Sequence, residues 1–301
     1  MFLYGLLFTI FGLSKEIKVP VFKTCWLVDT AMNLVDDSFF DICSRLKVPV
    51  KTLDSSSSDY FLKADLSDYF PKKSCVVYLG SIGSVPNVFR QGWFPGAYRD
   101  LEPLQCSSYI AAINQKSDIL LNRHYFFLPL SELATQISFI QKQFCLLDER
   151  IFIRPNSGNK VFSGQTINTE NIENEIDLLK KTYKVDDSEL CLISSNKKDL
   201  IEAEFRFVVV DGKVSAGSKY LPEEKTVKFR HSAFTFAQKC ATLYQPDSVF
   251  TLDVCRLNNG DYKLIELNSF SCAGLYQCDY EDIIRDVSRQ AKKEWNEMFS
   301  V

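Results

Sequence analysis

The sequence predicts an α+β protein in which a small N-terminal α/β domain precedes a larger unit of hairpins and helices. Three observations support this fold class. Apolar strands alternate with helical segments up to about residue 130, which is typical of a parallel sheet with crossover helices. Two long β-hairpins follow, marked by Asp211-Gly212 and Asn259-Gly260 between apolar runs. Helical patterns between and after these hairpins mix helices with antiparallel strands.

The first elements are short apolar runs separated by polar segments. We expect strands near Trp26–Val28, at Val48–Leu53 and at Cys75–Leu79, a helix over Asp36–Leu46 and a loop at Ser55–Ser58. A helix start at Pro129 and Ser131 marks the domain boundary. We therefore expect an N-terminal domain over residues 1–130 and a second domain over residues 131–301.

The second domain should contain further helices and strands besides the two hairpins. Its expected elements are a helix with apolar residues from Leu133 to Phe144, a strand at Ile151–Arg154, a helix over about Glu170–Lys181, a strand at Cys191–Ser194, a helical segment around Ala233–Leu243 and a charged helix from about Glu281 to Phe299.

Composition excludes several classes of function. The chain has 301 residues, of which 46% are hydrophobic and 24% charged, as expected for a soluble globular protein. A net charge of −3 gives no sign of a nucleic-acid-binding surface. The ten cysteines form no Cys-x-x-Cys pair and the only histidines are His124 and His231, which argues against zinc. We expect reduced thiols in a cytoplasmic protein.

The apolar start, Met1–Leu13, is too short to span a bilayer as a helix. It also lacks the positive first segment and the small-residue cleavage site of a signal peptide. We therefore expect no membrane association. A buried element or a rarely used upstream start codon accounts for the segment better than a signal or an anchor does.

The second hairpin brings acidic residues together. If Asn259-Gly260 is a two-residue turn, Asp253 lies directly opposite Glu266, and Thr251 lies opposite Asn268. Two facing carboxylates roughly 5 Å apart repel by about 3 kcal/mol at an effective dielectric constant of about 20. A bound divalent cation is the usual compensation, so the register predicts a metal site. Relieving the repulsion by Asp253→Asn or Glu266→Gln should leave the metal-free protein intact or slightly more stable.

Two alternatives stay open for this hairpin. One carboxylate can be neutralised by a neighbouring group. The turn can also be offset by one residue, which would send Asp253 to the other face of the sheet.

Two earlier segments carry basic residues. With Asp211-Gly212 as its turn, the first hairpin places Glu204 opposite Lys219, with Arg206 one step along the same face. This is either a cross-strand ion pair or a phosphate-binding pair of cations oriented by an acid. Upstream, Arg154 ends an apolar strand, and a loop with Gly158 leads to Lys160. Such loops can approach phosphates through backbone N–H groups, although a plain turn accounts for the composition equally well.

The order of these features resembles the ATP-grasp superfamily. The matching stretches are FIRPNSGNKVFSG (152–164), EAEFRFVVVDGKVSAGSKY (202–220) and LDVCRLNNGDYKLIELNSFSCAGLY (252–276). The similarity is to a divergent phage and bacterial branch that places an arginine and two lysines around ATP. Upstream, VVYLGSIGSV (76–85), WFPGAY (93–98) and LLNRHYFFLP (120–129) resemble the N-terminal domain of that branch.

The resemblance implies a role for each matching residue. Arg154 and Lys160 would contact ATP, and Arg206 and Lys219 would face the phosphates or the transferred group as catalytic residues. Asp253, Glu266 and Asn268 would hold Mg²⁺. The adenine-binding hinge would fall at about Leu192–Ser195, so that Ile193 and Ser194 contact the nucleotide together with Glu204. Serines stand there where many relatives have an acid, which leaves the ribose contact unassigned.

The resemblance also implies an activity. ATP-grasp enzymes activate a carboxylate as an acyl phosphate, which an amine or a similar nucleophile then attacks. We expect an ATP- and Mg²⁺-dependent carboxylate–amine or carboxylate–thiol ligase with small-molecule or peptide substrates. A small-molecule phosphotransferase and a nucleotide-binding module without turnover are the alternatives. Ser269–Tyr276, Gly80–Ser84 and Trp93–Tyr98 are candidates for the walls of the substrate site, or are packing turns.

Overall fold

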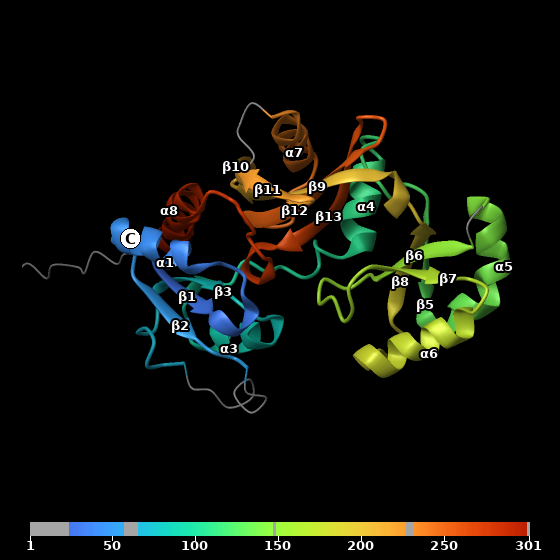
Figure 1. Cartoon of the computed structure of the whole chain (residues 1–301). Coiled ribbons are helices and arrows are strands. Elements are labelled where there is room, and N and C mark those ends of the chain that lie inside the picture. The colour runs from blue at the N-terminus through green and yellow to red at the C-terminus, as the bar shows by residue number, and fades with distance from the viewer. Residues whose placement is uncertain (1–23, 57–65, 147–148, 227–230, 300–301) are drawn as a thin grey trace, which may run out of the picture.

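Three sheets organise the chain in a computed structural model (Figure 1). The model describes residues 24–56, 66–146, 149–226 and 231–299. The apolar segment Met1–Leu13 and part of the expected loop Ser55–Ser58 therefore lie outside the described residues. In the described part, no helix is both long enough and apolar enough to cross a membrane. None of the ten cysteines, all of which lie in the described ranges, is joined in a disulfide.

The first sheet is parallel throughout, with the strand order β2-β1-β3-β4. Its elements are β1 (Cys25–Asp29), η1 (Thr30–Met32), α1 (Asp37–Arg45), β2 (Val50–Leu53), β3 (Cys75–Leu79), η2 (Ile82–Ser84), α3 (Val85–Arg90) and β4 (Phe94–Gly96). Asp36 caps α1 by accepting a hydrogen bond from the Ser38 N–H. The expected α/β unit, with its three strands and its helix, is confirmed.

The second sheet is antiparallel, with the order β5-β8-β6-β7. Helices α5 and α6 cover one face of it, where the isoleucines of β6 pack against both helices (Figure 1). The elements are β5 (Tyr125–Pro129), η3 (Leu130–Glu132), α5 (Leu133–Phe144), β6 (Arg150–Pro155), β7 (Gln165–Asn168), α6 (Ile172–Tyr183) and β8 (Leu190–Ser195). Because β5 pairs with β8, the boundary expected between residues 130 and 131 separates β5 from its own sheet.

The third sheet is the largest and has the order β11-β10-β9-β12-β13, antiparallel throughout. Its elements and the helices near it are α4 (Cys106–Asn114), η4 (Lys198–Leu200), β9 (Ile201–Val210), β10 (Lys213–Leu221), β11 (Glu223–Thr226), α7 (Ser232–Leu243), β12 (Val249–Leu257), β13 (Tyr262–Ser269), η5 (Phe270–Cys272) and α8 (Tyr280–Phe299).

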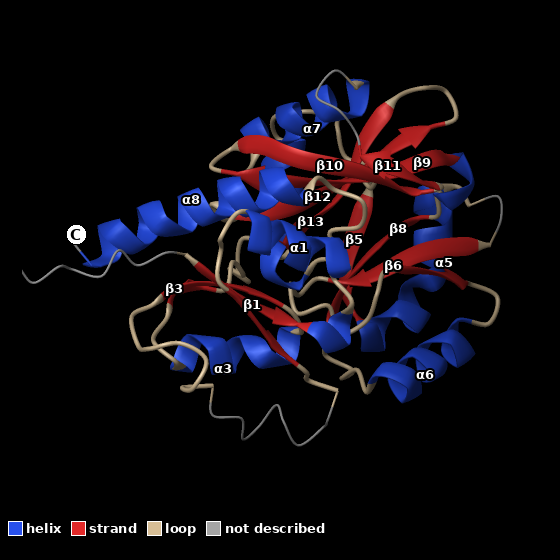
Figure 2. Ribbon diagram, turned by 60° about the vertical axis from the view of Figure 1, so that its left-hand side comes forward, coloured by secondary structure: helices blue, strands red, loops and turns tan. Residues whose placement is uncertain are grey.

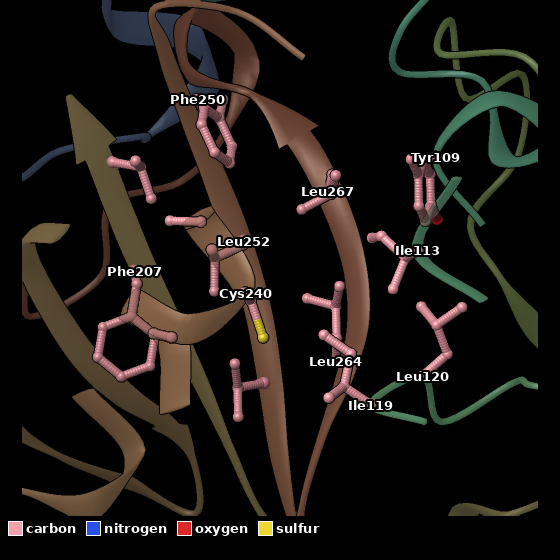
Figure 3. Packing of buried hydrophobic residues seen from close by; sticks show 14 of the residues in the cluster. Tyr109, Ile113, Ile119, Leu120, Phe207, Cys240, Phe250, Leu252, Leu264 and Leu267 are labelled. Atoms are coloured by element: carbon pink, nitrogen blue, oxygen red, sulfur yellow. The ribbon is translucent and has the colours of Figure 1, made fainter. Parts of the chain in front are cut away.

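The two faces of the third sheet have different neighbours. On one face, Phe207, Leu252 and Leu267 form a continuous core with α7 and with Tyr109 and Ile113 of α4 (Figure 3). On part of the other face, a second core joins β9 and β10 to α8 and to the parallel sheet. Figure 2 shows α8 passing above the parallel sheet, beside the large sheet. The remaining part of this face carries the charged residues described below.

The acidic hairpin reaches the expected pairing by a different route. The Asp261 carbonyl accepts a hydrogen bond from the Leu257 N–H at 2.8 Å, so the loop contains three residues, Asn258 to Gly260, and is offset by one. A β-bulge at Ile265 then shifts the register back. Asp253 therefore does face Glu266, and Thr251 does face Asn268. The two-residue turn was wrong, whereas both predicted pairs are confirmed.

The basic hairpin shows the opposite outcome. Asp211 and Gly212 do form its turn, and both have positive φ angles, 49° and 73°. A bulge at Ser215, however, moves the register by one, so that Lys219 faces Phe205. The predicted pair of Glu204 with Lys219 is therefore wrong. Glu204 instead accepts a hydrogen bond of 2.5 Å from the hydroxyl of Tyr220.

Candidate functional site

The second and third sheets bring most of the predicted residues together. Arg154 ends β6 and points away from the isoleucines of that strand, which pack under α5 and α6. Lys160 follows on the loop between β6 and β7. The other residues lie on the large sheet: Arg206 on β9, Asp253 on β12, and Glu266 and Asn268 on β13.

Glu266 binds two cations that come from the other sheet. Its Oε2 lies 2.8 Å from Nη1 of Arg154, and its Oε1 lies 3.1 Å from Nζ of Lys160. The side chain of Arg154 is only 7% exposed, so the ion pair is shielded from water. Burial acts to raise the pKa of Glu266, but Lys160 and Arg154 outweigh it and hold that pKa well below the usual range.

Asp253 pairs with Arg206 through two parallel hydrogen bonds. Nε of Arg206 donates to Oδ1 at 2.8 Å, and Nη2 donates to Oδ2 at 2.7 Å. The third guanidinium nitrogen, Nη1, donates to the Gly274 carbonyl at 3.0 Å. This bidentate geometry orients Arg206 and keeps its charge in a buried position.

Protein cations therefore compensate the two facing carboxylates. From the sequence, a metal ion was the expected compensation, and neutralisation by neighbouring groups was the alternative. A separate observation bears on the metal. Oδ1 of the buried Asn268 has no hydrogen-bond partner among the described residues, while its Nδ2 donates to Glu266 at 2.9 Å and to Asp253 at 3.4 Å. An unpaired carbonyl oxygen beside two carboxylates is a donor set that fits Mg²⁺.

A cavity of about 490 Å³ lies between the second and third sheets. Its lining includes Arg154, Glu204, Glu266 and the segment Asn196–Lys198 just after β8. The expected hinge residues lie nearby but have other contacts. Ile193 belongs to the core under α5 and α6, and the Ser194 hydroxyl donates to Asn122 Oδ1 at 3.0 Å. The hinge prediction was thus a few residues early.

A smaller cavity of about 80 Å³ adjoins the charged residues. Arg154 also lines this cavity, together with Lys160, Arg206 and Asn268. Ile82 and part of the loop after β13 form its other walls, as expected for Gly80–Ser84 and Ser269–Tyr276. The segment Trp93–Tyr98 does not contribute to that lining.

Gly80 holds the parallel sheet close to this loop. Its N–H donates to the Ser271 carbonyl at 2.8 Å. A Cβ atom at this position would lie 2.4 Å from Cβ of Asp29, so no larger residue fits without a shift. The N-terminal domain therefore forms part of the wall of the smaller cavity.

Lys219 stands apart from the other predicted residues. The register places it across from Phe205, whose ring belongs to the core on the opposite face of the large sheet. It lines neither of the two cavities among the described residues. Its role as a catalytic and ATP-binding residue stays a prediction.

Sequence reasoning missed two aromatic residues beside Arg206. The rings of Tyr220 and Tyr276 stack with centroids 4.7 Å apart, and the guanidinium lies 5.0 Å from the Tyr276 centroid. It also missed Asn122 and Lys197, which line the larger cavity. No local pattern distinguishes these four residues, because their positions depend on the bulges and on strand pairing between distant segments.

Comparison with known families identifies one matching model. Residues 138–285 match an ATP-grasp domain, family 2 of the clade with one arginine and two lysines. This range contains every predicted site residue, from Arg154 to Asn268. No curated protein matches the sequence.

Several solved structures share the fold over most of the chain. D-cycloserine synthetase DcsG superposes with a TM-score of 0.59 at 12% identity, covering 89% of this chain and 99% of the other. The D-alanine-D-alanine ligase from Coxiella burnetii gives 0.58 at 9% identity, with 92% and 97% covered. ATP-grasp ligase PsnB, in complex with a minimal precursor, Mg and ADP, gives 0.52 at 12% identity, with 89% and 98% covered. At these identities the similarity concerns the fold.

Proposed function

Since the chain belongs to the ATP-grasp superfamily, we propose that it is an ATP- and Mg²⁺-dependent ligase that joins a carboxylate to an amine or a thiol. The observation that carries this proposal is the position of Arg154, which lines both cavities. A nucleotide in the larger cavity would then direct its phosphates toward the smaller one. The acceptor carboxylate would bind in the smaller cavity.

The cations of the site suit a triphosphate. Arg154, Lys160 and Arg206 would offset its charge, and phosphoryl transfer depends chiefly on such positioning and neutralisation. Glu204 lines the larger cavity, so we assign it to the nucleotide, with its hydroxyl groups as the proposed contact. The segment Asn196–Lys198 takes the place proposed earlier for Ile193 and Ser194 at the hinge.

Asp253, Glu266 and Asn268 would hold Mg²⁺ when it is present. The ion would supply charge neutralisation at the phosphate oxygens of ATP. The residues of the chain would do the rest. Arg206, fixed by Asp253 and by Gly274, would orient the transferred phosphoryl group, and the loop after β13 would keep water from the acyl phosphate.

An ADP-release assay on the full-length protein tests this function. Carboxylates, including amino acids and small peptides, are supplied with Mg²⁺ and ATP, with and without amines or thiols. A ligase releases ADP and phosphate when both substrates are present. ADP with a stable phosphorylated product would identify a phosphotransferase instead. Stabilisation by Mg²⁺ and ATP without turnover would identify a nucleotide-binding module.

A variant pair makes the assay specific to the site. Arg206→Lys keeps the positive charge but cannot make the bidentate contact to Asp253, so turnover should fall at least tenfold, which is roughly 1.4 kcal/mol of transition-state stabilisation. Arg256→Lys, on the exposed part of β12, is the matched control and should keep full activity. Equal activity of the two variants would argue against this role for Arg206.

A further inference from the structure

Two buried oxygen atoms face each other beside the proposed metal ligands. Thr251 and Asn268 are directly opposite residues of β12 and β13. Thr251 is completely buried and Asn268 is 5% exposed. Among the described residues, neither Oγ1 of Thr251 nor Oδ1 of Asn268 has a hydrogen-bond partner. Burying such a group without a partner costs about 1–3 kcal/mol, so the arrangement needs a physical reason.

The amide of Asn268 is oriented for the metal-free state. Its Nδ2 donates to Glu266 and Asp253, because a carbonyl oxygen in that place would repel the two carboxylates. A cation between the carboxylates reverses the requirement, since only the amide oxygen can be a ligand. The amide must then turn over, which moves Nδ2 to the place that Oδ1 occupies now. Thr251 Oγ1, on the facing residue, has a lone pair free to accept from it.

We propose that Thr251 is a positioning residue for the metal site: its hydroxyl accepts the Asn268 amide N–H when Asn268 turns its oxygen toward Mg²⁺. The inference rests on the Mg²⁺ site of the proposed function. It accounts for both unpaired oxygens in the metal-free chain, because each gains its partner only when the ion is bound. Thr251 acts through Asn268 and does not itself contact the ion.

The test is metal affinity, measured without turnover. Mn²⁺, which takes the same oxygen ligands, is titrated into the full-length protein with and without ADP, and the free ion is followed by electron paramagnetic resonance. Thr251→Val should weaken Mn²⁺ binding about tenfold, the usual cost of losing such a supporting hydrogen bond. The same variant should keep or raise the melting temperature of the metal-free protein, because it removes an unpaired hydroxyl. A general packing defect would instead lower both quantities.

Further variants separate the hydroxyl from other effects. Thr251→Ser keeps the acceptor and should keep Mn²⁺ affinity, whereas Thr251→Ala should lose it if the valine variant does not fold. In an Asn268→Asp background there is no amide N–H, so Thr251→Val should cause no additional loss. Thr169→Val deletes a hydrogen-bonded, buried hydroxyl at the end of β7 and should lower stability without changing Mn²⁺ affinity.

Two results would overturn the inference in different ways. Equal Mn²⁺ affinity of the wild type and Thr251→Val would overturn the role of Thr251 and leave the metal site standing. No Mn²⁺ binding by the wild type, with or without ADP, would overturn both the inference and the Mg²⁺ site of the proposed function.

Discussion

Glu266 is the residue at which charges from both sheets meet, and this reverses an expectation for its removal. Considered alone, the facing pair with Asp253 predicts that Glu266→Gln relieves repulsion. In the structure, the same change takes away the partner of Arg154 and of Lys160. Leaving a buried arginine without its counter-charge is costly, so we expect the metal-free protein to lose roughly 3 kcal/mol of unfolding free energy. Urea denaturation at neutral pH measures it.

Glu202→Gln is the matched control for this prediction. Glu202 pairs with Arg256 at 3.2 Å, and both side chains are nearly half exposed, at 47% and 44%. Such a surface pair contributes less than about 1 kcal/mol, so its loss should hardly change the denaturation curve. A Glu266→Gln protein as stable as the control would mean that repulsion between Asp253 and Glu266 offsets the loss of both ion pairs.

Asp247 gives the chain a pH-dependent stability. Burial, reinforced by the nearby Glu294 and Asp100, raises the pKa of Asp247 to about 6, against about 3.9 in an unfolded chain. The folded state therefore binds more protons between these values, and the unfolding free energy falls as the pH rises from about 4 to about 6. Asp247→Asn should remove this fall and stabilise the protein at pH 7 by about 1–2 kcal/mol. Denaturation curves of both proteins at pH 4 and pH 7 measure the difference, and parallel changes would contradict the assignment.

The identity of individual site residues could be predicted well where the chemistry is local. Arg154 at the end of an apolar strand, and Asp253 facing Glu266, follow from composition and from pairing within one hairpin. The partners of these residues could not be predicted in the same way. Arg154 reaches Glu266 across two sheets, and Arg206 lies beside Tyr276 through a loop, so these contacts depend on how distant segments pack.

At the scale of elements, the two hairpins show what turn chemistry can determine. Most helices and strands lie within two residues of their expected positions, because apolar spacing and caps are local signals. Register is less secure, since a bulge has no clear sequence signal. The bulge at Ser215 made the Glu204–Lys219 pairing wrong. The bulge at Ile265 compensated an offset turn and kept Asp253 opposite Glu266.

This compensation predicts different effects for two single-residue deletions in the acidic hairpin. Deleting Ile265 removes the bulge and forces either Glu266 and Asn268 or the core residue Leu264 onto the wrong face. We expect loss of Mg²⁺-dependent stabilisation by ATP and a melting temperature lower by several degrees. Deleting Asn259 shortens the loop to Asn258-Gly260, a favoured two-residue turn, and leaves every pair of the ladder in place.

Differential scanning fluorimetry, with and without Mg²⁺ and ATP, compares the two deletions. The Asn259 deletion should keep the shift that the wild type gives. If both deletions abolish that shift equally, the position of Glu266 does not depend on the bulge.

For the whole molecule, chain order predicts the kinds of element better than their grouping. The expected boundary at residue 130 followed the helix start at Ser131, but β5 precedes it and belongs to the second sheet. The C-terminal helix α8 likewise returns to the N-terminal sheet. Neither relation can be predicted from local patterns, because both join segments that are far apart in the chain.

The position of α8 predicts which parts of the molecule unfold together. Ile284 and Trp295 of α8 share one buried core with the parallel sheet and with β9 and β10, whereas the second sheet has its own core under α5 and α6. Ile284→Ala should therefore destabilise the parallel sheet and the large sheet together, by about 2–5 kcal/mol. Native-state hydrogen exchange followed by mass spectrometry should show faster exchange in β1, β3, β9 and β10 alike, with β6 and β8 unchanged. Ile176→Ala, in the core of the second sheet, is the control and should give the reverse pattern. Faster exchange in the parallel sheet alone would mean that α8 stabilises the N-terminal domain without coupling it to the sheet that carries Arg206 and Asp253.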